Sequence, residues 1–251
     1  MPRLFGIHSV EEALRAGRPI EQVWIARGVA NPRLQRIIEQ CRRSGVPLRF
    51  HARESLDRAV GGGAHQGVLA VAAAHRYREL DDVLRPGGDA ALLVLLDGVE
   101  DPHNLGAIIR TAHAAGADAV VIPDRRAAPL TEAAAKAAAG ALEYLPVVRV
   151  ANLNRALERL KQSEYWIFGL DERADQSYDR VEYSRRAALV LGGEGKGLHQ
   201  QVARHCDFLV KIPTEGPIGS LNVSVAAGVV LFEACRQRRL FADLAAERPT
   251  R

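Results

Sequence analysis

The chain has 251 residues, of which 47% are hydrophobic and 25% are charged, and its formal net charge at pH 7 is +4. This composition is that of an ordinary globular protein and excludes a disordered or fibrous chain. The small positive charge suits a polyanionic partner but does not identify one.

The sequence also argues against membrane insertion, secretion and metal binding. No apolar run reaches the ~18 residues that a membrane-spanning helix needs, and the first residues lack the apolar core of a secretory signal. We therefore expect a cytoplasmic protein. Cys41, Cys206 and Cys235 are far apart and form no zinc-binding pattern, so we expect three reduced packing residues and no metal site.

The first third of the chain predicts a small α/β domain, residues 1–74. Residues 23–26 (VWIA) and 66–74 (QGVLAVAAA) read as strands, and residues 32–43 read as a helix between them. Residues 75–89 are mostly polar and end in Pro-Gly-Gly, which is typical of a linker.

Residues 90–251 predict a second, larger α/β domain. Six continuous apolar runs are typical of strands buried on both faces: 92–97, 119–123, 145–150, 165–170, 187–192 and 208–213. Helices are predicted between and after them, one at 105–115 with Asn104 as its N-cap, and a last long one with an apolar stripe from Val223 to Ala234. Such alternation predicts a parallel sheet covered by helices, with ligands bound beyond the carboxyl ends of the strands.

Three glycine-rich or polar clusters follow predicted strands and open toward helices, at 97–112, 191–198 and 212–228. Their glycines let backbone amides approach a ligand closely. The cluster GGEGKG at 192–197 is not a P-loop, because Lys196 is followed by glycine rather than serine or threonine. It also lacks the spacing and the early position of a dinucleotide fingerprint.

Taken together, the clusters resemble the three signature motifs of the SpoU family of RNA ribose methyltransferases. The matching segments are NLGAIIRTA, LVLGGEGKGL and IPTEGPIGSLNVSVAAGVVLFEA, in the family's order and strand contexts. The first domain, which ends in HQGVLA, is similar to the RNA-binding domain of the member that methylates a guanosine ribose in bacterial large-subunit (23S) ribosomal RNA.

This resemblance implies a fold and a cofactor that no periodicity could predict. Family members thread the end of the parallel sheet through a loop as a deep trefoil knot (the SPOUT fold), although knots are nearly absent among proteins. The knot forms the pocket for S-adenosylmethionine, and members are usually homodimers. By motif position, the cofactor-binding residues of this chain are Gly192, Gly193, Gly195, Ile212 and Leu221.

The resemblance also implies a catalytic set: Asn104, Arg110, Glu194, Ser220 and Asn222. Arg110 matches the arginine that the family is proposed to use at the reacting hydroxyl, as a general base. A guanidinium stays protonated in proteins, so a clamp for an RNA phosphate is an equally good role for it, and a plain surface arginine is the third reading.

The other members of the set also have structural alternatives. Asn104 can act in the site or cap its helix, and Ser220 and Asn222 can face the methyl donor or cap the last helix. Glu194 can hold a neighbouring group in place or accept a proton. His65 and His103 are left outside the catalytic set, and Glu100 and Asp101 are expected at the loop and helix start.

Few aromatic residues occur in the first domain, so RNA binding there is expected to rely on phosphate and shape contacts. The candidate side chains are Arg27, Arg33, Arg36, Arg42 and Arg43, if they share a face. A solvated helix surface is the alternative reading.

We expect an enzyme that methylates ribosomal RNA, with no DNA or membrane partner. The alternatives are the same chemistry on transfer RNA, a catalytically silent RNA-binding module of the same fold, and, more distantly, a nucleotide-dependent oxidoreductase. The presence of all five catalytic-set residues favours an enzyme over a silent module.

Overall fold

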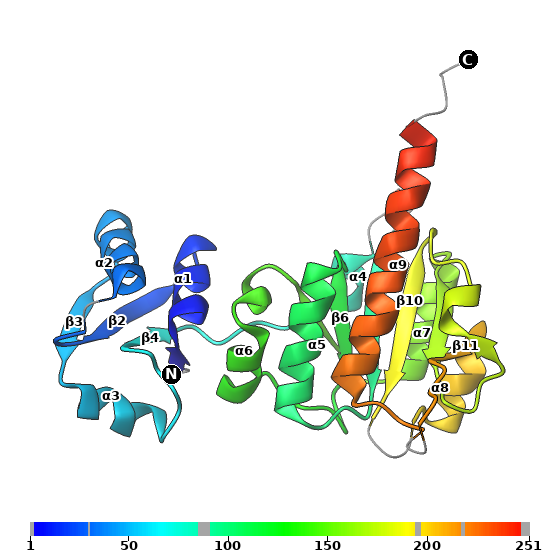
Figure 1. Ribbon diagram of the computed structural model, residues 1–251, viewed down its shortest axis with the longest axis horizontal. Coiled ribbons are helices and arrows are strands. Elements are labelled where there is room, and N and C mark those ends of the chain that lie inside the picture. Colours follow the sequence, from blue (N-terminus) through cyan, green and yellow to red (C-terminus); the bar gives the residue numbers. More distant parts are fainter. Residues whose placement is uncertain (1–2, 30, 85–90, 194–196, 217–218, 247–251) are drawn as a thin grey trace.

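The computed structural model describes residues 3–29, 31–84, 91–193, 197–216 and 219–246. They form two β-sheets of very different size, each with its own helices, and the chain passes from the small sheet to the large one (Figure 1). The α/β class expected from the sequence is confirmed for both parts.

The small sheet has four strands in the order β1-β4-β2-β3. β4 lies antiparallel to β1 and β2, whereas β2 and β3 are parallel. The strands are β1 (Arg3–Phe5), β2 (Ile20–Ala26), β3 (Leu48–His51) and β4 (Val68–Ala72). Its helices are α1 (Ile7–Arg15), α2 (Pro32–Ser44) and α3 (Arg53–Val60).

The predicted helix α2 shows how the local sequence sets its ends. Asn31 is the N-cap, and its side chain accepts a hydrogen bond from the backbone N–H of Arg33, while Pro32 occupies the first helical position, where no N–H is needed. Gly45, with φ of 71°, ends the helix in the left-handed conformation that glycine adopts without strain.

The segment between the sheets is more ordered than the linker reading suggested. Arg78 makes a parallel bridge to Val148 at the edge of the large sheet, and α4 (Leu80–Val83) begins with a capping box between Glu79 and Asp82. The Pro-Gly-Gly breaker at 86–88 lies outside the described residues.

The large sheet has seven strands in the order β7-β6-β5-β10-β8-β11-β9, and every pair is parallel. All six predicted strands are present: β5 (Leu92–Asp97), β6 (Ala119–Pro123), β7 (Val147–Val150), β8 (Trp166–Leu170), β10 (Ala187–Gly192) and β11 (Phe208–Lys211). The short β9 (Gln176–Ser177) was not predicted. The parallel sheet is therefore confirmed.

Helices cover both faces of the large sheet. One face packs against α5 (Pro102–Ala114), α6 (Glu132–Ala138) and α9 (Val223–Ala246), and the other against α4, α7 (Leu153–Gln162) and α8 (Gln200–His205). Two 3-10 turns, η1 (Ala141–Glu143) and η2 (Tyr178–Arg180), complete the described elements.

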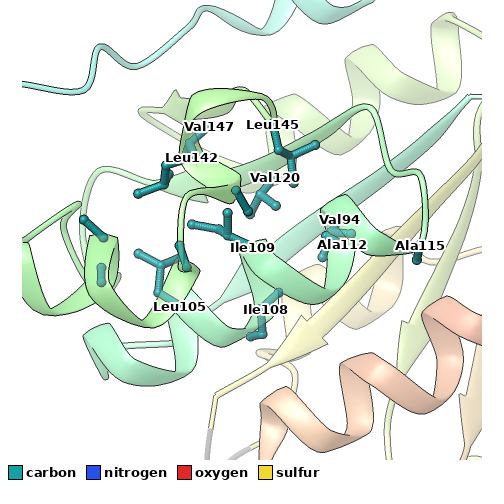
Figure 2. Packing of buried hydrophobic residues seen from close by; sticks show 14 of the residues in the cluster. Val94, Leu105, Ile108, Ile109, Ala112, Ala115, Val120, Leu142, Leu145 and Val147 are labelled. Atoms are coloured by element: carbon teal, nitrogen blue, oxygen red, sulfur yellow. The ribbon is translucent and has the colours of Figure 1, made fainter. Parts of the chain in front are cut away.

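The core on the α5 side fixes the helix that carries the first motif. Leu105, Ile108 and Ile109 are fully buried and lie against Val94 and Val120 of neighbouring strands (Figure 2). Burial of each such side chain contributes about 1.5–3 kcal/mol. The predicted apolar stripe of α9 is buried in the same way, at Val223, Ala226, Ala227, Val230, Leu231 and Ala234.

The two sheets are joined by polar contacts between α1, the strand ends and the η1 region. Arg18 forms an ion pair of 2.9 Å with Glu143, and both side chains are almost fully buried. The Tyr144 hydroxyl donates a hydrogen bond of 2.6 Å to Glu12, and the backbone N–H of Arg3 donates to Glu132. Buried polar side chains therefore contribute to the attachment of the small sheet to the large one.

The described residues include all three cysteines and every helix named above. Cys41, Cys206 and Cys235 are free thiols, as expected. Within the described part, no helix has the length and apolar character needed to cross a membrane.

Candidate functional site

The site lies beyond the carboxyl ends of the central strands of the large sheet. The chain runs from β5 outward through β6 to β7, and then returns to the other side of β5 with β10 and β8. A sheet in which the strand order reverses in this way leaves a crevice at the reversal, where α/β proteins bind ligands. Asp97 and Gly192, the last residues of β5 and β10, are paired at this point.

A cavity of about 430 Å³ opens at the ends of β8, β10 and β11. It brings together residues of the second and third predicted motifs: Gly192, Gly193, Ile212, Ser220, Leu221 and Asn222. Its volume lies within the range typical of small-molecule sites. Of the five predicted cofactor-binding residues, four line this cavity, and Gly195 lies outside the described residues.

Close backbone approach explains the glycines at the end of β10. A Cβ atom at Gly192 would lie 2.2 Å from the carbonyl carbon of Gly197, and one at Gly193 would lie 2.1 Å from the carbonyl oxygen of Gly98. The Gly193 N–H donates a hydrogen bond of 2.8 Å to the Asp97 carbonyl. No side chain fits where the second motif crosses the end of β5.

A second cavity, of about 450 Å³, adjoins the first and shares Gly193, Gly197 and Val223 with it. Its other walls include Asn104 of α5, which was predicted for the site, and Glu100 and Asp101, which were expected only as loop and helix-start residues. Arg126 and His199 complete its polar lining. The three sequence clusters therefore meet at two adjoining cavities.

One hydrogen bond links the first and third motifs directly. The Asn222 side-chain Nδ2 donates to Asn104 Oδ1 at 3.0 Å. Asn104 is only 7% exposed and lines the second cavity, whereas Asn222 lines the first. The two asparagines thus stand at the junction of the cavities.

The predicted capping roles are partly wrong. Asp101, not Asn104, caps α5: its side chain accepts from the backbone N–H of His103, and Pro102 takes the first helical position. The sequence reading placed the helix start too late, because it followed the apolar stripe rather than the Asp-Pro pair. Asn104 is the third residue of α5, so it does not cap the helix, and it lines the second cavity instead.

Asn222 has the expected capping role at the start of α9. Its Oδ1 accepts from the backbone N–H groups of Ser224 and Val225, while its Nδ2 reaches Asn104. Ser220 is exposed, precedes the helix and lines the first cavity. The Asn222 side chain therefore caps α9 and also contacts Asn104 at the junction of the cavities.

Two members of the catalytic set are not placed in the cavities. Arg110 is exposed on α5, six residues after Asn104, and lines neither cavity as the described residues form them. Glu194 lies outside the described residues.

His65, which was left outside the catalytic set, belongs to the small sheet. It is buried in the turn before β4, where its Nε2 contacts Asp57 and its Nδ1 accepts from the Gly67 N–H. These bonds give it a structural role in that turn.

Sequence reasoning missed several polar residues of the two cavities. Asp97 is 7% exposed, and its carboxylate accepts hydrogen bonds from His199 N–H at 2.7 Å and from His199 Nδ1 at 2.9 Å. Arg126, from the loop after β6, donates to His199 Nε2 at 3.3 Å. The signal that could have found Asp97 is a carboxylate at the very end of a buried strand.

The rim of the first cavity carries another missed carboxylate, Asp171, which follows β8. Arg173 donates to both of its oxygens, and these hydrogen bonds hold the pKa of Asp171 below its usual value. Asp171 is therefore an anion at neutral pH, and its charge is paired with that of Arg173. No group of three His, Cys, Asp or Glu side chains suited to a metal ion occurs among the described residues.

Comparison with known proteins shows to which family the chain belongs. Residues 91–232 match the model of the SpoU rRNA Methylase family, and residues 3–78 match that of the RNA 2'-O ribose methyltransferase substrate binding domain. The chain belongs to the SpoU rRNA methylase family. The first match contains the large sheet and both cavities, and the second contains the small sheet.

The SpoU relatives cover almost the whole chain. YacO of Bacillus subtilis, whose name covers both tRNA and rRNA methyltransferases of the TrmH family, is 42% identical over 94% of this chain and 95% of its own. The 23S rRNA (guanosine-2'-O-)-methyltransferase RlmB of Pseudomonas putida is 41% identical over 96% of this chain and 98% of its own. The crystal structure of the SpoU methyltransferase AviRb from Streptomyces viridochromogenes in complex with AdoMet has a TM-score of 0.80 at 25% identity, covering 95% of this chain and 90% of AviRb.

Proposed function

We propose that this SpoU-family chain transfers the methyl group of S-adenosylmethionine to the ribose 2′-hydroxyl of a guanosine in 23S ribosomal RNA. The observation that carries the proposal is the near full-length similarity to RlmB, which includes both the small and the large sheet. The convergence of the three motifs on two adjoining cavities supports it from the chain itself.

The first cavity fits the cofactor. Gly192, Ile212 and Leu221 line it, in agreement with their motif positions. Gly192 and Gly193 have no side chains, which lets their main-chain polar groups approach a ligand closely. Apolar side chains with a few polar groups are the usual lining of such a site. S-adenosylmethionine supplies an electrophilic methyl group on a sulfonium when it is bound there.

The residues around the junction of the cavities orient the reacting groups. Asn222, held by the start of α9, and its partner Asn104 place amide groups between the donor cavity and the second cavity. Ser220 lines the donor side. Glu194 belongs to the second sequence motif and is proposed, from its motif position alone, to hold a neighbouring group in place or to accept a proton. Arg110 is proposed to grip an RNA phosphate, a role that suits an exposed guanidinium better than proton abstraction does.

RNA binding and methyl transfer are proposed to belong to two different domains, joined by a connecting segment. Residues 1–74 bind substrate RNA, residues 75–89 connect, and residues 90–251 bind the donor and catalyse. Exposure of Arg27, Arg33, Arg36, Arg42 and Arg43 supports phosphate binding by the first domain. Helical spacing puts Arg33, Arg36 and Arg43 within about 80° of one another and Arg42 about 180° from Arg33, so Arg42 is the weakest member of that face.

The catalytic domain is proposed to contain the trefoil knot of the family. The tight crossing of Gly193 over Gly98, the contact of Gly192 with Gly197, and the return of the chain to the same edge at Ile212 support a threaded arrangement there. Such a crossing needs glycine where the two backbones touch.

The active form is proposed to be a homodimer that acts in the cytoplasm. Large apolar side chains of α9 remain exposed in the single chain: Val225, Phe232, Leu240 and Phe241. Helical spacing puts Val225, Phe232 and Leu240 within about 80° of one another and Phe241 about 160° from Val225. The exposed apolar face formed by the first three suits burial against a second copy. Light scattering of the purified protein should give twice the chain mass, and a Phe232→Glu variant should shift it to one chain mass.

Methylation of transfer RNA is the second candidate, favoured by the name of YacO, which covers both substrates. The test is to incubate the protein and methyl-labelled S-adenosylmethionine with unmodified 23S rRNA and, separately, with unmodified tRNA. We expect label in 23S rRNA. Label in tRNA alone would replace the proposed substrate, and label in neither RNA would contradict the proposed function.

A further inference from the structure

Asp97 and His199 form a carboxylate–imidazole pair at the wall of the second cavity. Asp97 is the last residue of β5 and is 7% exposed. His199 follows the second motif in sequence, and its side chain is 41% exposed. Both Asp97 oxygens are used by His199, one by its backbone N–H and one by Nδ1. The imidazole is therefore anchored on one edge and open on the other.

The hydrogen bonds fix which nitrogen of His199 carries a proton. A carboxylate only accepts, so Nδ1 carries the hydrogen that Asp97 receives, and Nε2 keeps its lone pair. Arg126 donates to that lone pair at 3.3 Å. Nε2 is thus an acceptor at the cavity wall, covered by a long, exposed side chain that an RNA phosphate can attract.

The pair stands beside the junction where the motifs meet. His199, Asn104 and Gly193 line the same cavity, and a Cβ placed on Gly98 would lie 3.5 Å from His199 Cε1 and 4.0 Å from Gly193 N. Gly193 also lines the donor cavity. A ribose in the second cavity would therefore lie between the donor cavity and His199.

We propose that His199 accepts the proton of the reacting 2′-hydroxyl, with Asp97 as the residue that positions it; this inference rests on the proposed methyl transfer to RNA. As the oxygen forms its bond to the methyl carbon, the sulfur–methyl bond breaks and its electron pair stays on sulfur, leaving a neutral thioether. The hydroxyl proton passes to His199 Nε2, and the Asp97 carboxylate stabilises the resulting imidazolium. Water then removes that proton.

A purely structural role does not account for the imidazole. The His199 backbone N–H already ties the second motif to Asp97 through one carboxylate oxygen, and any residue at position 199 except proline would make that bond. The side chain adds a second bond, a fixed tautomer and an accepting nitrogen in the cavity, which are the attributes of an oriented general base.

The test compares His199→Asn with His205→Asn. The amide of the introduced asparagine can occupy the place of the imidazole Nδ1 and donate to Asp97, but it has no atom at the Nε2 position. His205 lies on α8, six residues away, lines neither cavity and contacts Glu158, so it controls for the same change nearby. Binding of S-adenosylmethionine by calorimetry and single-turnover methyl transfer to 23S rRNA are measured for both variants and the wild type.

We expect His199→Asn to bind the donor within about threefold of the wild type and to transfer methyl at least about a hundredfold more slowly, as is usual for loss of a proton acceptor. His205→Asn should keep wild-type rates. Asp97, Glu100, Asp101 and Arg126 are the other charged residues that line the second cavity, and they remain in the variant.

Two outcomes overturn the inference separately from the proposed function. Methyl transfer by His199→Asn at the wild-type rate removes His199 from the reaction while the proposed function stands. Absence of transfer by the wild type to any RNA overturns the proposed function itself, and the inference with it.

Discussion

Asn222 and Asn104 lie 118 residues apart in sequence and are joined by a side-chain hydrogen bond of 3.0 Å between the start of α9 and the first turn of α5. The bond connects two helices that cover the same face of the large sheet, at the edge where β5 and β10 end. Because each asparagine lines a different cavity, the pair fixes the position of the donor cavity relative to the second one.

The dual role of Asn222 gives the first prediction. Asn222→Ala removes both the α9 cap and the bond to Asn104, so we expect about 1 kcal/mol lower stability to unfolding and about a hundredfold slower methyl transfer. The matched control is Asn152→Ala. Asn152 caps α7 through Asn154 and Arg155 N–H, away from both cavities.

Asn152→Ala should show a similar loss of stability, measured by urea denaturation, with unchanged turnover. If both variants lose turnover equally, the asparagine pair acts through stability alone and has no place in the site.

The crossing of Gly193 over Gly98 gives the second prediction. Gly193→Ala puts a Cβ atom 2.1 Å from a backbone oxygen that cannot move independently, so we expect S-adenosylmethionine binding to be lost. Gly216→Ala is the control, because a Cβ there meets nothing within 4 Å. Calorimetric titration of both variants with the cofactor tests this, and wild-type affinity in Gly193→Ala would contradict it.

Arg110 gives the third prediction. Its exposure on α5, outside both cavities, means that Arg110→Ala should leave cofactor affinity nearly unchanged and reduce turnover at least about a hundredfold. Arg155→Ala, a change at an exposed arginine on the opposite face of the sheet, is the control. Steady-state kinetics with RNA, together with cofactor titration, measure both effects.

If Arg110 clamps a phosphate, Arg110→Lys should recover part of the activity, chiefly through a lower KM for RNA. Near-normal turnover in Arg110→Ala would remove the residue from the site.

Much of the large domain could be predicted because its signal is local. β5, β6 and β10 have the predicted limits, since strands buried on both faces appear in sequence as unbroken apolar runs. The short strands β1, β3 and β9 have no such run. In β3 (Leu48–His51), for example, no residue is fully buried, and the segment is a strand because it pairs with β2. Tertiary pairing, not local propensity, makes these strands.

The site was predictable in its motifs but not in its polar partners. Gly192, Ile212 and Asn222 could be placed because the resemblance gave them positions, and the structure brings them to one cavity. The Asp97–His199 hydrogen bond joins residues 102 positions apart, and the local sequence around either residue contains no signal that predicts this pairing. Such pairs depend on the order of strands in the sheet, which periodicity does not specify.

The buried contact between the sheets gives a fourth prediction, on pH. Arg18 donates to His75 Nε2 and to Glu143, and burial together with the nearby Arg18 charge lowers the pKa of His75 from 6.5 to about 4. Between these values the unfolded chain binds a proton that the folded one does not, so this contribution to stability is full above pH 6.5 and is lost as the pH falls toward 4.

Burial raises the pKa of Glu143, which gives the opposite slope above 4.5. The effect of His75 is therefore isolated by comparing urea denaturation of the wild type and His75→Asn across this range. We expect the variant to lose less stability on acidification than the wild type does. Parallel stability curves for the two proteins would show that His75 is not held neutral in the fold.

Methyl transfer to a guanosine ribose of 23S rRNA can be decided from the chemical identity of the product. Large-subunit ribosomal RNA treated with the protein and labelled S-adenosylmethionine is digested to nucleosides and analysed by mass spectrometry. We expect the label in 2′-O-methylguanosine from one position of 23S rRNA. Label on a base, or on a ribose of tRNA alone, would contradict it.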